Sequence, residues 1–194
     1  MREFLSRGRK DKYTKTCRHC QADSETCPHI IGNCPRMQDA RIKRHNHIGK
    51  VPTEEGKKKG WVVLQEPRTR DTNEELPKPD LVFVKDDPAF VVDVTVRYET
   101  TKTAGGAAAE KVNKYSRLRK EIQHLTNAKE VVFMGFPTGS GGKWHQGNFG
   151  LLGALGLSKP TQEKSARSLS SIALVSSVDI VHVFASKSRD CTVL

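Results

Sequence analysis

The chain has 194 residues, of which 33 are Lys or Arg and 22 are Asp or Glu, so its formal net charge is +11. This balance excludes an acidic disordered chain and favours a polyanionic partner, most often nucleic acid. The most apolar run, residues 131–136, is far shorter than the roughly 18 residues of a membrane span, and the N-terminus lacks a signal-peptide core. We therefore expect a soluble, intracellular protein without a membrane partner.

Positive charge and cysteines are both concentrated near the N-terminus. Residues 1–60 contain 15 Lys or Arg against 7 Asp or Glu, and four of the five cysteines lie between residues 17 and 34. In an intracellular chain, such crowding indicates a metal site rather than disulfides. The spacing C-x2-C-x8-H-x4-C would offer Zn²⁺ the soft tetrahedral set that it favours. The predicted zinc ligands are Cys17, Cys20, His29 and Cys34.

The third zinc ligand is open to alternatives. Cys27 lies two residues before His29, and His19 lies between the first two cysteines, so either could substitute. With four protein ligands the zinc would be structural, because no coordination position is left for a substrate. A module of this size, residues 1–38, buries too little surface to fold alone, so the metal would supply folding energy.

A basic link follows over residues 39–60. Helical spacing after residue 40 would place several cations on one face, suited to phosphate contacts, although a solvated helix face is the plain alternative. Pro52 and Gly56 interrupt a helix that continues past His47, so we expect a loop there. The predicted nucleic-acid-binding residues are Arg41, Lys43, Arg44, His45 and Asn46.

Residues 61–190 are expected to form the main domain. Three β-rich runs, at 61–66, 81–85 and 89–97, precede a fourth strand at 130–136, and the turn at 86–88 predicts a hairpin. Near the C-terminus, residues 163–187 predict a helix, with a strand at 178–184 as the alternative.

Acidic side chains lie at the ends of these strands or inside them. Asp80 precedes one hairpin strand and Asp93 lies inside the other, where a carboxylate needs a cation or a donor to offset its desolvation. Pairing of the hairpin would bring the two together, and Glu66 at the end of the preceding strand is the natural third member. Hard carboxylate oxygens gathered in this way predict a Mg²⁺ site.

A predicted helix at 107–125 places Lys111 in the middle of its apolar stripe. This lysine would reach a negative partner under the helix, either the carboxylates or a bound phosphate. Carboxylates that hold Mg²⁺ beside a lysine are the minimum needed for phosphodiester hydrolysis. The alternative is a structural arrangement, in which Asp80 caps a turn and Asp93 forms a buried ion pair with Lys111.

The order and spacing of these motifs resemble the C-terminal restriction-like endonuclease of site-specific non-LTR retrotransposons of the R-two type. The resemblance covers residues 17 to 185 and implies a PD-(D/E)xK nuclease: an α/β fold with a restriction-endonuclease-like mixed sheet flanked by helices, preceded by a small zinc finger. Its motifs are the Cys/His finger, Arg41–Asn46, Gln65–Pro67, Lys78–Asp80, Val92–Thr95, Lys111–Tyr115 and Gly139–Trp144.

The resemblance also implies an activity and partners. Asp80 and Asp93 would bind Mg²⁺, Glu66 would assist, and Lys111 would complete the site in place of the usual lysine, a position that Thr95 occupies here. The implied activity is nicking of double-stranded host DNA in the nucleus, so that the freed 3′-OH primes reverse transcription of element RNA. Because no reverse-transcriptase segment precedes residue 17, we expect a fragment that acts with such an enzyme, or a non-catalytic DNA-binding remnant.

Overall fold

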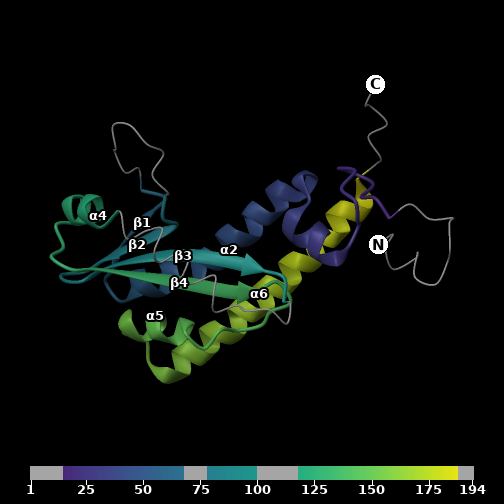
Figure 1. Cartoon of the computed structure of the whole chain (residues 1–194). Coiled ribbons are helices and arrows are strands. Elements are labelled where there is room, and N and C mark those ends of the chain that lie inside the picture. The colour runs from purple at the N-terminus through teal and green to yellow at the C-terminus, as the bar shows by residue number, and fades with distance from the viewer. Residues whose placement is uncertain (1–14, 68–77, 100–117, 188–194) are drawn as a thin grey trace.

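The computed structural model describes residues 15–67, 78–99 and 118–187 (Figure 1). Within them, one four-stranded sheet has the order β1-β2-β3-β4; β1, β2 and β3 pair antiparallel, and β4 runs parallel to β3. The sheet is therefore mixed and flanked by helices, and the Cys/His cluster precedes it, which confirms the predicted fold class. The strands are β1 (Val62–Gln65), β2 (Leu81–Val84), β3 (Ala89–Arg97) and β4 (Val131–Gly139).

The central strand β3 is apolar on both faces, because helices cover both sides of the sheet. Phe90 and Val92 belong to one buried cluster, and Ala89 and Val91 belong to another on the opposite face. The predicted hairpin is confirmed: Leu81 pairs with Val92 across it.

Helices α2 (Gln38–Lys58), α5 (Asn148–Ala154) and α6 (Lys159–Ser186) contribute to the first cluster, and α4 (Arg119–Thr126) contributes to the second (Figure 1). Of the helix predicted at 107–125, the part up to residue 117, with Lys111, lies outside the described residues. The helical prediction near the C-terminus is confirmed by α6, and the alternative strand is not formed.

Helix α2 corrects the prediction of a loop after His47, since it continues through Pro52 to Lys58. Its residues that disfavour helix lie on the buried face, where they allow close packing on the sheet. A Cβ at Gly56 would lie 2.8 Å from Cε1 of Phe83, so only glycine fits at this contact. Packing against the sheet outweighs the loss of one backbone hydrogen bond at proline and the weak helix propensity of glycine.

Helix α6 is long and apolar enough, by length and composition, to cross a membrane: one 18-residue window has a mean hydropathy of 1.6. No such segment was expected, because its apolar residues alternate with small polar ones rather than forming one run. In the fold, Leu169 and Ala173 are buried in the sheet cluster, and Ile180 and Phe184 are buried against the Cys/His segment. One helix thus supports both parts of the molecule (Figure 1).

The Cys/His segment shares its core with α6 instead of having one of its own. A π-helical turn (His29–Asn33) and a 3₁₀ turn (Pro35–Met37) lead directly into α2. Within the segment, the fully buried Glu25 accepts hydrogen bonds from the backbone and guanidinium of Arg18, which fixes the loop between the first cysteines and His29.

Candidate metal and nucleic-acid sites

The four predicted zinc ligands form a compact group. The ligand atoms of Cys17, Cys20, His29 and Cys34 all lie within 4.8 Å of one another. The Sγ atoms of Cys17 and Cys34 are 4.0 Å apart, close to the roughly 3.8 Å that tetrahedral Zn–S bonds of about 2.3 Å imply. This donor set fits Zn²⁺.

Among the alternatives for the third ligand, position favours His29. Cys27 is not a member of the group, whereas His29 Nε2 lies 3.2 Å from Cys20 Sγ. His19 faces away: its Nε2 lies 2.8 Å from the carbonyl oxygen of Phe184, and its ring packs edge-on against the Phe184 ring. Burial raises the pKa of the Cys34 thiol to about 12, so a bound cation would be needed to stabilise the thiolate.

The three predicted carboxylates lie at one end of the β1–β2–β3 ladder: Glu66 follows β1, Asp80 precedes β2 and Asp93 lies in β3. The backbone N–H of Glu66 donates to the Asp80 carbonyl, which places these two residues opposite each other. Because Leu81 pairs with Val92, the next position along the same register sets Asp80 opposite Asp93. Directly opposed residues have Cβ atoms about 5 Å apart, so the sheet brings together residues that are distant in the sequence.

The Asp80 carboxylate meets helix α2 at this end of the ladder. Its Oδ2 accepts a 2.7 Å hydrogen bond from the backbone N–H of Val94 and lies 3.2 Å from Nε2 of His45. The carboxylate of Asp80 raises the pKa of His45 to about 9, despite partial burial of the imidazole. His45 is therefore in direct contact with a predicted metal ligand.

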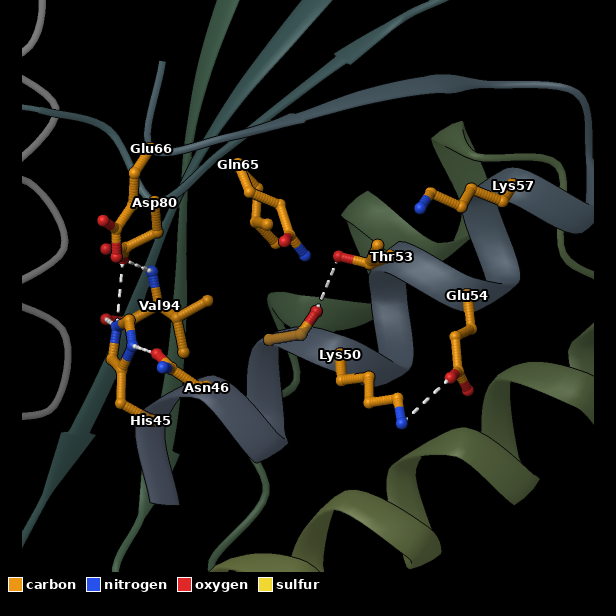
Figure 2. A pocket seen from close by; sticks show the side chains of 12 residues that line it. His45, Asn46, Lys50, Thr53, Glu54, Lys57, Gln65, Glu66, Asp80 and Val94 are labelled. Atoms are coloured by element: carbon orange, nitrogen blue, oxygen red, sulfur yellow. Dashed lines mark hydrogen bonds and ion pairs between the residues drawn. The ribbon is translucent and has the colours of Figure 1, made fainter. Parts of the chain in front are cut away.

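A pocket of about 560 Å³ opens beside this pair, between α2 and the ends of β1 and β2 (Figure 2). Figure 2 shows the carboxylates of Glu66 and Asp80 on the same side of the pocket, next to His45. Lys50 and Lys57 on the α2 wall are not among the predicted nucleic-acid-binding residues, because a loop was expected after His47. The α2 residues that line the pocket are His45, Asn46, Gly49, Lys50, Thr53, Glu54 and Lys57, at helical spacing.

Asp93 lies on the adjacent strand β3 but does not line the pocket. Its side chain is buried, and Oδ2 accepts a 2.9 Å hydrogen bond from the hydroxyl of Thr95. Among the described residues, the Cys/His group is the one set of three or more His, Cys, Asp or Glu side chains with ligand atoms so close together. Glu66, Asp80 and Asp93 are thus adjacent by register without converging to that degree, and Lys111 is outside the described residues.

The predicted nucleic-acid residues divide into different environments. Arg44 is only 3% exposed, and its guanidinium donates to Ser177 Oγ of α6 and to the Ile31 carbonyl of the finger. Arg44 is therefore a buried link between elements, and its contact with nucleic acid stays a prediction. His45 lines the pocket beside Asp80, and Arg41 donates to the Cys34 carbonyl.

Lys43 lies on a second, basic groove of about 400 Å³ between α2 and α6. Exposed cations from both walls face this groove, which gives it a net positive charge. Its ionisable lining residues are Arg36, Asp39, Lys43, Arg44, His47, Asp179 and Lys187. Of the five residues predicted to bind nucleic acid, Lys43 and Asn46 are both exposed and line a groove or pocket.

Comparison with known proteins identifies relatives of this chain. A Retrovirus-related Pol polyprotein from type-1 retrotransposable element R2 of Popillia japonica is 30% identical over 149 residues, which are 76% of this chain and 31% of that polyprotein. Other relatives of this chain are also R2 polyproteins. The one from Bradysia coprophila is 30% identical over 81% of this chain and 18% of its own length. The one from Nasonia vitripennis is 33% identical over 47% of this chain and 9% of its own length.

The chain spans less than a third of the length of each of these R2 polyproteins. No family model matches the sequence. Homology to R2 polyproteins supports a retrotransposon origin and is consistent with nucleic-acid partners.

Proposed function

We propose that this chain is the metal-dependent DNA endonuclease domain of a retrotransposon-derived protein. In this proposal it acts in the nucleus and nicks double-stranded target DNA, leaving a 3′-OH that primes reverse transcription of the element RNA. The observation that carries the proposal is that Glu66 and Asp80 line a pocket with lysines on its wall, with Asp93 on the adjacent strand β3.

The donor set suits Mg²⁺, which prefers a few carboxylate oxygens and retains several waters. Asp80 and Asp93 would hold the ion with help from Glu66, and bound Mg²⁺ would polarise the phosphate and lower the pKa of the attacking water. In the proposed reaction, a water oxygen forms a bond to phosphorus, the bond from phosphorus to the 3′ oxygen breaks, and that oxygen takes up a proton. Lys111 would stabilise the charge that develops on the phosphate.

Helix α2 supports DNA binding on both of its flanks. Lys50 and Lys57 line the pocket beside Asp80, and Lys43 lines the basic groove, so phosphates on either side of the cut would meet cations from one helix. The basic groove also supports a second candidate function, a DNA-binding remnant without catalysis. Its cations could bind phosphates without any contribution from Glu66, Asp80 or Asp93.

A nicking assay on supercoiled plasmid tests the proposal. The wild-type protein should nick in Mg²⁺, and Asp80→Asn or Asp93→Asn should reduce the rate at least about a hundredfold, because a metal ion contributes several kcal/mol of charge stabilisation. DNA affinity, measured by fluorescence anisotropy, should persist in both variants.

The matched control is Asp86→Asn in the β2–β3 turn. Asp86 is exposed and has a φ of 51°, which asparagine tolerates well, so nicking should be unchanged. Wild-type protein that binds DNA and leaves the plasmid intact at every Mg²⁺ concentration would support the remnant instead.

A further inference from the structure

The imidazole of His45 is surrounded by hydrogen-bond acceptors. Its Nε2 lies 3.2 Å from Asp80 Oδ2 and 3.1 Å from the Val94 carbonyl oxygen, and its Nδ1 lies 3.3 Å from Asn46 Oδ1. A proton on Nε2 lets the ring donate to both the Asp80 carboxylate and the Val94 carbonyl. His45 thus joins α2 to the sheet (Figure 2).

His45 contacts Val94 because β2 does not extend far enough to pair with this residue of β3. The strand begins at Leu81, so Val94 of β3 lies beyond the paired part of the hairpin. On the edge of β3 that would face β2, the Val94 N–H donates to the Asp80 carboxylate, and the Val94 carbonyl oxygen lies 3.1 Å from Nε2 of His45. Two side chains thus take the place of a missing strand partner, which satisfies backbone groups that would otherwise be unpaired.

Both contacts of the Asp80 carboxylate use the same oxygen. Within the described residues, Oδ2 meets Val94 N–H and His45 Nε2, whereas Oδ1 has no hydrogen-bond partner. The side chain of Asp80 is 22% exposed at the pocket wall, so Oδ1 is the oxygen that remains for a ligand.

We propose that His45 is a positioning residue that fixes the Asp80 carboxylate through Oδ2, so that Oδ1 is presented to the divalent metal ion. The inference rests on the proposed function, because it takes Asp80 as a metal ligand. It goes further in giving His45 a role at the metal site instead of on the DNA. It also makes α2 the element that both contacts DNA and sets the geometry of the site.

Two substitutions separate the nitrogens of His45. The amide nitrogen of His45→Gln can occupy the place of Nε2 and donate to both Asp80 and Val94, whereas that of His45→Asn reaches only the place of Nδ1. Mn²⁺ binding to the zinc-loaded protein, followed by electron paramagnetic resonance, measures the site without requiring catalysis. Asp80→Asn is the reference that removes the ligand, and His124→Asn on α4, where the side chain is exposed, is the matched control.

We expect His45→Asn to weaken Mn²⁺ binding about tenfold, the usual cost of losing a group that orients a ligand, and His45→Gln to stay within about threefold of the wild type. Zinc content and the thermal midpoint should stay near wild-type values in both variants; His45→Ala replaces His45→Asn if the latter fails to fold. Equal Mn²⁺ affinity in His45→Asn and wild type, equal losses in the Asn and Gln variants, or Mn²⁺ binding that Asp80→Asn leaves intact would overturn the inference. Mn²⁺ binding that depends on His45 in a protein that never nicks DNA would instead reject the nuclease and leave the positioning role standing.

Discussion

Two adjacent cations on α2 differ in role because the helix turns about 100° between them. Lys43 is exposed at the basic groove, whereas Arg44 is buried against α6 and the finger. Burial lowers the pKa of Arg44 to about 10, and its Nε has no hydrogen-bond partner among the described residues. The charge of Arg44 is thus held by neutral acceptors, and its function is structural.

At this scale we predict opposite outcomes for the two residues. Lys43→Glu should lower DNA affinity about tenfold and reduce its salt dependence, because a phosphate contact is lost. Arg44→Ala should lower the free energy of unfolding by about 3 kcal/mol, because the Ile31 carbonyl and Ser177 lose their donor. Fluorescence anisotropy and urea unfolding check the pair, with Lys120→Glu on the exposed face of α4 as control. A tenfold loss of DNA affinity in a folded Arg44→Met variant would contradict the structural assignment.

Helix α2 shows how an element can form against its own propensities. Gly49, Pro52 and Gly56 disfavour helix one by one, but their spacing places them together on the face that meets β2 and β3. Close approach to the sheet buries Ile48 completely and keeps His45 within reach of Asp80. The same small residues that indicated a loop are therefore the ones that position the pocket wall.

The two glycines of α2 provide a test. Gly56→Ala should destabilise the fold by about 1–3 kcal/mol, because the new Cβ would lie 2.8 Å from the Phe83 ring in a packed core. Gly49→Ala should instead stabilise by up to about 1 kcal/mol, because its Cβ would meet Val94 at an ordinary 3.8 Å and alanine favours helix. Thermal and urea unfolding measure both. Similar effects of the two substitutions would show that contact with Phe83 does not limit the approach of the helix.

On the scale of the whole molecule, the finger and the sheet domain are joined by α6. Its first half packs under the sheet and its second half completes the core of the finger through Ile180 and Phe184. Lys187 then donates to the Arg36 carbonyl, which extends this junction past the end of the helix. Zinc bound to the cysteines would therefore stabilise more of the chain than the finger segment.

Removal of zinc tests this coupling. Cys17→Ser should release about one zinc ion per chain and raise hydrogen exchange both in the finger and at 177–186 of α6, while β3 and β4 stay protected. Cys27→Ser is the matched control and should keep its zinc, because Cys27 is outside the ligand group. Unchanged protection of α6 after zinc loss would mean that the finger folds independently of it.

Features that depend on local pattern could be predicted from the order of the residues. Cysteine spacing predicted the four side chains that cluster, and strand alternation with a turn at 86–88 predicted the hairpin that pairs Leu81 with Val92. Tertiary structure alone decided that α2 continues through Pro52, that Arg44 is buried and that His45 meets Asp80. These outcomes depend on contacts between residues far apart in the chain, whose packing energy outweighs local propensity and leaves no periodic signal in the sequence.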